Sequence, residues 1–222
     1  HVSGNITKAT KYYQDCINQG IKDCRVFSNY GIILNNLGKL KDAELSYRKA
    51  IEINPNYANA HYNLGNLLFN LRRLKDAEFY TRKAIGINPN FANAHSNLGK
   101  ILYSLGKLKD AELSYRKAIH LNPSFTDAYY NLGNLFFDLN KLKDAELSYR
   151  KATQINPNFT AAHYNLGRIS IDLGKLKDAE LSYRKAIELN PNFAICHANL
   201  GDLLRDLGKL KDSEFHTRKA IE

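Results

Sequence analysis

The chain has 222 residues and a formal net charge of +10, with 44% hydrophobic and 24% charged residues. This is the composition of an ordinary globular protein, and no apolar run of about 18 residues exists that would span a bilayer. Three cysteines, with no pair at CxxC spacing, argue against a disulfide framework and a redox or zinc motif. We therefore expect a cytoplasmic protein with no membrane span.

The prolines reveal an internal repeat, because all five stand 34 residues apart. They are Pro55, Pro89, Pro123, Pro157 and Pro191. The dipeptide Leu-Gly recurs in the same phase, with Tyr30-Gly31 as a divergent first copy, and the segment 39–50 recurs unchanged from residues 107, 141 and 175. A fixed period of this length indicates a repeat array.

In chain order, the array predicts one helix and then a series of helix pairs. Residues 1–23 align with the back half of a repeat, so we expect the second helix of a degenerate preceding copy. The copies that follow are 24–57, 58–91, 92–125, 126–159, 160–193 and the truncated 194–222. Since both end copies are incomplete and the sequence has no methionine, we expect one domain from a longer protein.

The first helix of each copy is predicted from the residues around Leu-Gly. Steps of about 100° per residue place His61, Leu64, Gly65 and Leu68 on one arc, which we expect to face the core. The opposite arc is expected to be open to a ligand. In the second copy it carries Asn59, Tyr62, Asn63, Asn66, Phe69 and Asn70.

The second helix is predicted from an apolar stripe at three- and four-residue steps, which the Asn-Pro dipeptide ends. The central glycine of the first helix costs about 1 kcal/mol in helix propensity. We expect it to allow close packing of the two helices, with Gly65 near the small Ala77, so that a larger side chain at either position would overpack the pair.

These residues resemble the tetratricopeptide repeat: an aromatic or His residue, Leu-Gly, a small residue such as Ala43, a further Ala, and the closing Pro. The resemblance covers nearly the whole chain. It implies an all-α, right-handed α-solenoid, or superhelix, of stacked antiparallel helix pairs, with a concave groove lined by the first helices. The array is also similar to the superhelical repeats of the O-GlcNAc transferase family, which carry an asparagine ladder.

The first helices vary between copies while the second helices hardly change, and this contrast predicts that the first helices bind the partner. One asparagine precedes every Leu-Gly or its equivalent: Asn29, Asn63, Asn97, Asn131, Asn165 and Asn199. A primary amide has two donors and an acceptor, so such a row can bond the backbone of an extended peptide. A purely structural role for these asparagines stays open.

Aromatic and polar residues surround the asparagine row. The candidates for ligand contact are Tyr62, Asn66, Phe69, Lys100, Tyr103, Tyr130, Asn134, Phe137, Tyr164 and Arg168. The aromatic rings are typical anchors for a partner, although packing between adjacent first helices is the alternative. Near the end of the chain, Asp138, Asp172, Asp202 and Asp206 favour a basic or neutral segment.

The net positive charge comes from the second helices and the residues that lead into them. The repeated charged positions are Lys39, Lys41, Asp42, Glu44, Arg48 and Lys49 with their equivalents. We interpret them as a solvated face with Glu44 and Arg48 paired at i,i+4. Nucleic acid is disfavoured as a partner, because no aromatic residues interleave with the lysines.

Catalytic and metal motifs are absent from the sequence. His61, His95, His163 and His197 align four residues before their glycines, but Tyr129 interrupts the row, and we expect packed histidines rather than metal ligands. The sequence has no phosphate loop, nucleophile elbow or zinc-binding helix motif. We therefore expect no cofactor, no metal and no enzyme.

The sequence thus predicts a protein–protein interaction scaffold that binds an extended peptide or partner segment in the groove. Two alternatives stay open. In the first, the array is a substrate-presenting or regulatory module of an enzyme whose catalytic domain lies outside these residues. In the second, it self-assembles through its terminal repeats. The last helix exposes Phe215 and Ile221 and the segment 6–17 lacks its partner helix, so we also expect weak self-association through the terminal helices.

Overall fold

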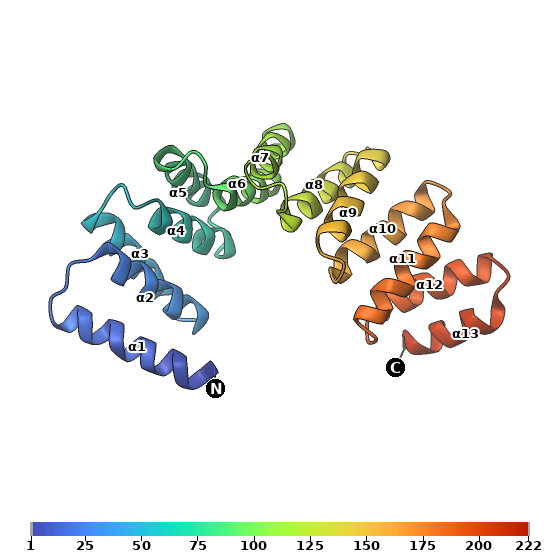
Figure 1. Cartoon of the computed structure of the whole chain (residues 1–222), viewed down its shortest axis with the longest axis horizontal. Coiled ribbons are helices and arrows are strands. Elements are labelled where there is room, and N and C mark those ends of the chain that lie inside the picture. Colours follow the sequence, from blue (N-terminus) through green and yellow to red (C-terminus); the bar gives the residue numbers. More distant parts are fainter. Residues whose placement is uncertain (1, 222) are drawn as a thin grey trace. The chain divides into compact units, whose positions relative to one another are not determined.

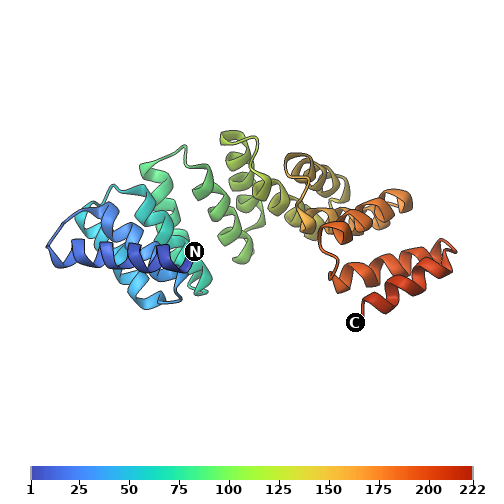
Figure 2. The same ribbon diagram turned by 60° about the horizontal axis from the view of Figure 1, so that its bottom comes forward.

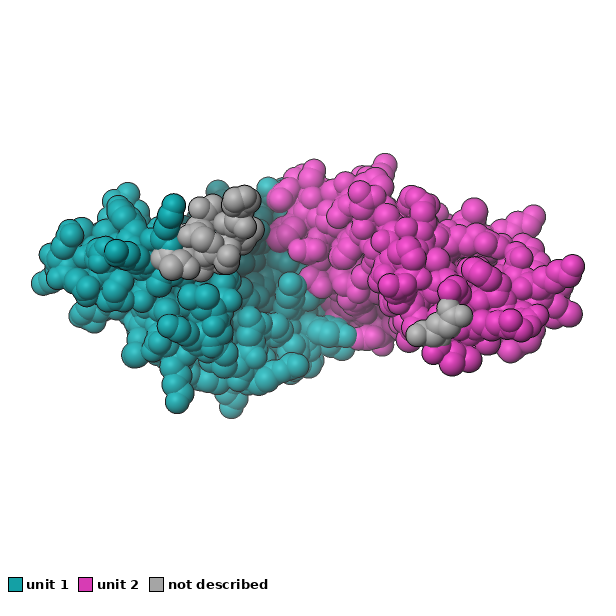
Figure 3. Space-filling view, turned by 90° about the horizontal axis from the view of Figure 1, so that it is seen from below, with its two compact units in different colours: residues 1–121 teal, residues 122–222 magenta. Residues whose placement is uncertain are grey.

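The structure is a computed structural model that describes residues 2–221, with side chains described from residue 8 onward. The chain forms two compact units, residues 1–121 (unit 1) and 122–222 (unit 2), which have different colours in Figure 3. The all-α prediction is confirmed, since the described residues form helices joined by short turns and contain no strand. The side chain of Ile6, at the start of the predicted first segment, lies outside the described residues.

Unit 1 contains one leading helix and then helix pairs (Figure 1). Its helices are α1 (Val2–Asn18), α2 (Cys24–Asn36), α3 (Leu40–Ile53), α4 (Ala58–Asn70), α5 (Leu74–Ile87), α6 (Ala92–Ser104) and α7 (Leu108–Leu121). Unit 2 consists of helix pairs throughout its described residues. Its helices are α8 (Thr126–Asp138), α9 (Leu142–Ile155), α10 (Thr160–Asp172), α11 (Leu176–Leu189), α12 (Ala194–Asp206) and α13 (Leu210–Lys219).

Each first helix (α2, α4, α6, α8, α10, α12) packs most extensively against the second helix that follows it (α3, α5, α7, α9, α11, α13). The pair α12 and α13, for example, lies side by side in both Figure 1 and Figure 2. Within each unit, a second helix then packs against the next first helix, as α3 does against α4 and α9 against α10. This is the stacked-pair architecture that the 34-residue period predicts.

The Asn-Pro turn between copies is held by two side chains. After α3 ends at Ile53, the Asn54 Oδ1 accepts the backbone N–H of Asn56 at 3.0 Å. The ring of His61 then donates from Nε2 to the Pro55 carbonyl oxygen at 2.8 Å. His95, His163 and His197 repeat this contact, each with the proline six residues earlier. The aligned histidines are therefore packing residues, as the sequence predicts.

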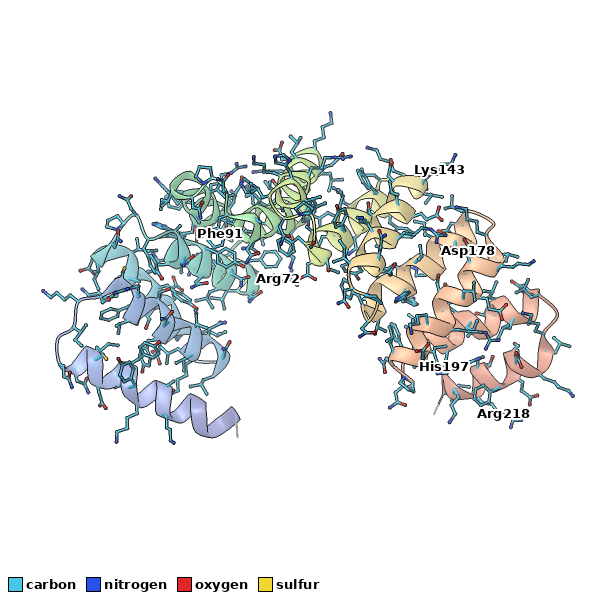
Figure 4. The ribbon with its side chains drawn as sticks, viewed as in Figure 1. Arg72, Phe91, Lys143, Asp178, His197 and Arg218 are labelled. Carbon is cyan, nitrogen blue, oxygen red and sulfur yellow. The ribbon has the colours of Figure 1, made fainter. Side chains whose placement is uncertain are left out.

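The turn inside each pair needs a left-handed residue, because the chain reverses directly after the first helix. Gly38 has φ of +73° there, and its N–H bonds to the Asn35 carbonyl oxygen at 3.0 Å. Glycine adopts this conformation without strain. Arg72 and Asn140 hold the same position with φ of 60° and 56°; Arg72 is labelled at the end of α4 in Figure 4.

The glycine at the centre of each first helix lies close to the second helix, as predicted. A Cβ atom on Gly65 would lie 2.5 Å from the Thr81 hydroxyl oxygen and 3.3 Å from the Ala77 carbonyl oxygen. At Gly133 it would lie 2.6 Å from the ring of Tyr149. Tyrosine rings occupy the same place beside Gly31, Gly99 and Gly167. At Gly31, Gly99, Gly133 and Gly167 the missing side chain therefore leaves room for a tyrosine ring of the second helix, rather than for a small residue such as Ala77.

Candidate functional site

The six asparagines of the row lie on the first helices, but their amides differ in environment. Asn29 is exposed, Asn97 is 6% exposed, and the other four are half-buried. The Asn63 Nδ2 donates to the Ser28 hydroxyl at 3.3 Å, and the Asn199 Nδ2 donates to the Tyr164 hydroxyl at 3.1 Å. These donors link neighbouring first helices. Their contact with a ligand stays a prediction.

The most developed polar network of the row lies in unit 2. The Asn165 Nδ2 donates to the Asn134 Oδ1 at 3.1 Å and to the Tyr130 hydroxyl at 3.4 Å. The hydroxyl of Tyr149 donates to the same Asn134 oxygen at 2.8 Å. The network therefore connects α8, α9 and α10 and fixes the amide of Asn134 in one orientation. Fixed polar groups on a helical face lower the entropic cost of binding a peptide.

Three of the predicted aromatic anchors pack against the phenylalanine that directly precedes the next first helix. The ring of Tyr62 lies 4.9 Å from that of Phe91, and Tyr130 and Tyr164 make the same contact with Phe159 and Phe193. All three tyrosines are half-buried, and burial raises the pKa of Tyr62. Phe91, Phe159 and Phe193, which lie at the N-terminal ends of the following first helices, therefore cover part of the arc that was expected to be open to a ligand.

Unit 2 has a cleft of about 480 Å³ on its first helices. It is lined by Phe137 of α8, by Arg168, Ile171 and Asp172 of α10, by Leu176 and Tyr183 of α11, and by Asn199, Asp202, Leu203 and Asp206 of α12. Apolar floor and polar rim occur together here. That combination is typical of a binding site in which apolar contacts bury the ligand and a few polar groups fix its orientation.

Arg168 stands at one side of this cleft over aromatic rings. Its guanidinium carbon lies 4.8 Å from the ring centre of Phe137 and 5.9 Å from that of Tyr164. A cation over an aromatic face is attracted by the ring's negative charge density. Phe137 and Arg168, which the sequence predicts as two separate candidates, therefore form one surface.

Three carboxylates also line the cleft, those of Asp172, Asp202 and Asp206. Asp202 forms an ion pair with Arg205 at 3.0 Å, while the nearest atoms of Asp206 and Arg205 are 3.9 Å apart. Asp172 is exposed and makes no ion pair within the part of the chain that the structure describes. Three carboxylates against two guanidinium groups leave the cleft favourable to a basic ligand group.

The remaining candidates lie on the first helices of unit 1. Asn66 and Lys100 are half-buried on α4 and α6, as is Tyr103. Phe69 packs against the hydrophobic core around Leu67 and Leu68. Phe69 is therefore partly a core residue. A cavity of about 620 Å³ in unit 1 lies between α1, α2 and α3 and is lined by other residues, among them Gln14, Tyr30 and Arg48.

Two buried tyrosines of the second helices, Tyr149 and Tyr183, reach the face of the first helices, and neither is among the predicted site residues. Tyr149 and Tyr183 are 2% and 1% exposed, yet Tyr149 bonds to Asn134 and Tyr183 lines the cleft. Burial raises the pKa of both phenols, so they remain neutral hydrogen-bonding groups. The sequence signal for this arrangement is the glycine of the first helix beside each ring, because the missing side chain lets a tyrosine of the second helix extend past the first helix.

The charged face of the second helices is more than a solvated surface. Glu146 is 9% exposed, and it accepts from Arg150 of its own helix at 2.9 Å and from Lys175 at the start of the next second helix at 2.6 Å. Burial alone would raise the pKa of Glu146, but the two cations outweigh it and hold the pKa below its usual range. The predicted i,i+4 pairs are confirmed, and they extend into ion pairs between copies.

The same repeat-to-repeat ion pair joins Glu44 to Arg73, Glu78 to Lys107 and Glu180 to Lys209. Each joins one second helix to the start of the next.

Among the described residues, no three histidine, cysteine or acidic side chains are grouped as a metal site would require. No helix within the described range is long and apolar enough to cross a membrane.

Models of three related repeat families match the sequence. The TPR repeat model matches residues 31–71 and 99–140, and a tetratricopeptide repeat model matches residues 58–91, 126–159 and 160–193. A second tetratricopeptide repeat model matches residues 182–215. The chain belongs to the tetratricopeptide repeat family. The fold of this family is that of a protein–protein interaction scaffold, and its members are generally not catalysts.

Solved structures have the same fold. PilF of Pseudomonas aeruginosa matches with a TM-score of 0.80 and 20% identity, over 87% of this chain and 88% of that one. YrrB, a TPR protein with an unusual peptide-binding site, matches with a TM-score of 0.64 and 24% identity, over 83% of this chain and 95% of that one. MamA matches with a TM-score of 0.66 and 25% identity, over 72% and 94%. No curated protein sequence matches the chain.

Proposed function

We propose that the chain is a scaffold that binds an extended peptide segment of a partner protein on the first helices of unit 2. The observation that carries this proposal is the cleft of about 480 Å³ between α8, α10 and α12, which combines aromatic, amide and carboxylate groups. A tetratricopeptide protein of similar fold, YrrB, is described as having a peptide-binding site, and this likeness supports the same use here.

The chemistry of the cleft favours a peptide with a basic side chain. Asp172 and Asp206 supply carboxylates at its rim, while the floor around Leu203 accepts an apolar neighbour of the basic residue. The Asn199 amide is the group placed to bond the peptide backbone, since its oxygen is an acceptor for a peptide N–H. Charge sets the preference, and the amide holds the backbone whatever the other side chains are.

A selection from phage-displayed random linear peptides tests the proposal, with the immobilised chain as bait. We expect enrichment of peptides that contain Lys or Arg next to an apolar residue. Affinity for a selected peptide should fall about tenfold in the double variant Asp172→Asn, Asp206→Asn, since two charge-assisted contacts are lost. The matched control removes the same charge from second helices, as Asp110→Asn with Asp144→Asn.

Three results would overturn the proposal: no enrichment, enrichment of acidic peptides, or an equal loss of affinity in the control. Thermal unfolding of each variant separates a local loss of binding from a loss of structure. Because Asp172, Asp206, Asp110 and Asp144 are all exposed, we expect both double variants to unfold within a few degrees of the parent chain.

A further inference from the structure

The exposed face of every second helix carries the same three-residue pattern, a lysine, a large apolar residue and a second lysine at i, i+4 and i+8. Residues at this spacing share one side of a helix. The apolar members are 55–69% exposed. They are Leu45, Phe79 and Leu113 in unit 1, and Leu147, Leu181 and Phe215 in unit 2.

These exposed apolar side chains contribute little to the fold. Glu44, beside Leu45, is the half-buried member of the two and joins Arg48 to Arg73. The sequence order therefore buries the charged residue and exposes the apolar one, the reverse of what burial alone favours. Phe215 holds the same place in the pattern and is exposed like its equivalents in earlier copies, although here the neighbouring Glu214 is exposed as well.

The lysines that precede the apolar residues are exposed and available. They are Lys41, Lys75, Lys109, Lys143, Lys177 and Lys211. None forms an ion pair with another described residue, and Lys143 extends away from the ribbon in Figure 4. The second lysine of the pattern is less uniform, because Lys49 pairs with Glu52 while Lys83 lies over the ring of Phe79.

We propose that this lysine–apolar stripe docks the protein on an anionic lipid surface. Helices that lie on membranes combine lysines, which meet the lipid phosphates, with Leu or Phe side chains, which enter the boundary of the acyl chains. Each unit presents three such helices, so neither unit depends on the other for contact.

The charge pattern argues for this occupant over the alternatives. A second copy of the chain would bring lysines against lysines. Nucleic acid would use the lysines but leave the exposed leucines in water, and the stripe lacks the aromatic rows that stack bases. An acidic amphipathic helix would need several apolar residues along one groove, whereas each second helix offers one.

Vesicle flotation tests the proposal with the parent chain. Vesicles of phosphatidylcholine with about 30% phosphatidylglycerol should carry the protein at physiological salt, and pure phosphatidylcholine vesicles should not. The variant Lys109→Gln, Lys143→Gln should bind about tenfold more weakly. Its control, Lys107→Gln with Lys175→Gln, removes the same charge from lysines that pair with Glu78 and Glu146, and should bind nearly as well as the parent.

The apolar residues give the deciding comparison, because changing them leaves the net charge unaltered. The variant Leu113→Gln, Leu147→Gln should lose most of its vesicle binding. The chain has no tryptophan, so Leu113→Trp introduces a single reporter, whose emission should shift to the blue with anionic vesicles. Ile171→Trp, in the peptide cleft, should show no shift.

Absence of binding to anionic vesicles at physiological salt would overturn the proposal. So would full binding by the Leu→Gln variant, equal loss in the two lysine variants, or an unshifted Leu113→Trp spectrum. Tighter binding to duplex DNA or RNA than to the vesicles would also overturn it, because nucleic acid would then be the partner of the stripe. Circular dichroism of each variant checks that the helices are intact.

Discussion

Two kinds of helix pair occur in this chain, and they differ in where they place one aromatic ring. In α2–α3, α6–α7, α8–α9 and α10–α11, a tyrosine fills the space beside the central glycine. In α4–α5 and α12–α13, a threonine takes that position, and the residue before it is Tyr80 or His216. A shift of one residue along a helix therefore moves the ring to a different face.

The shift decides which surface is filled. The ring of Tyr80 stacks on His61 at 6.0 Å, and its hydroxyl accepts from Arg48 at 2.8 Å. Where serine stands instead, as at Ser114, a cleft of about 410 Å³ opens beside α7. The tyrosine pairs thus build the first-helix face, and the threonine pairs fill the space between second helices. One backbone serves both arrangements.

The largest effect is expected from emptying a tyrosine pair. The variant Tyr149→Thr removes a fully packed ring and its bond to Asn134, so the free energy of unfolding should fall by about 3 kcal/mol, measured by urea unfolding. Adding Ser148→Tyr converts the pair to the threonine kind and should recover part of this loss. A double variant no more stable than the single one would show that the two arrangements are not interchangeable.

Filling the space beside the glycine should have the next largest effect. The variant Gly133→Ala places a methyl group against the Tyr149 ring, and overpacking of about 1–3 kcal/mol should outweigh the gain in helix propensity. Gly65→Ala should cost less, because the Thr81 hydroxyl can rotate away. Equal unfolding free energies for the two variants would contradict the difference between the pairs.

The two threonine pairs differ from each other in one hydrogen bond. The Thr81 hydroxyl is buried and has no partner among the described residues, whereas the Thr217 hydroxyl donates to the Ser213 carbonyl oxygen at 2.9 Å. Thr81→Val should therefore raise the free energy of unfolding by about 1 kcal/mol, and Thr217→Val should not. Stabilisation by both variants would show that the bond at Thr217 contributes nothing.

The smallest effect concerns pH. The Nδ1 atoms of His216 and His197 are 2.9 Å apart. Burial, together with the neighbouring His197 and Arg184, lowers the pKa of His216 below its ordinary value of 6.5. Since the unfolded chain then binds the proton more readily, stability should fall as the pH drops below 6.5. Hydrogen exchange of α13 at about pH 7.5 and about pH 5.5 measures this.

The control for the pH effect is His216→Tyr, which copies Tyr80 and removes one imidazole. This variant should lose the part of the pH dependence that is local to α12 and α13. The carboxylate of Asp212 acts in the opposite direction on His216, so an unchanged exchange rate in the parent chain would show that it cancels the other groups.

Much of the fold could be predicted from the sequence, because the evidence is periodic. The prolines mark the helix ends, Leu-Gly marks the first helices, and the aligned histidines are packed residues as expected. The burial of Tyr62 could not be read in this way, since the covering Phe91 is the residue directly before the next first helix and its approach depends on how copies stack.

The candidate site was less predictable than the fold. Spacing places Tyr149 in the core, but it does not say that the ring passes the glycine and bonds to Asn134. The same spacing offers the amides of Asn165 and Asn199 to a ligand, although each already donates to a neighbouring tyrosine. Side-chain length and direction decided these points. Phe215 is exposed as predicted, and its equivalents in internal copies are exposed too; self-association through the terminal helices stays a prediction.

The most direct test is a nuclear magnetic resonance titration of the labelled chain with a peptide from the phage selection. The backbone amides of α8, α10 and α12 and the side-chain amides of Asn134, Asn165 and Asn199 should shift in a saturable way, while those of α9 and α13 stay in place. Shifts confined to the second helices, or to unit 1, would contradict a peptide site on the first helices of unit 2.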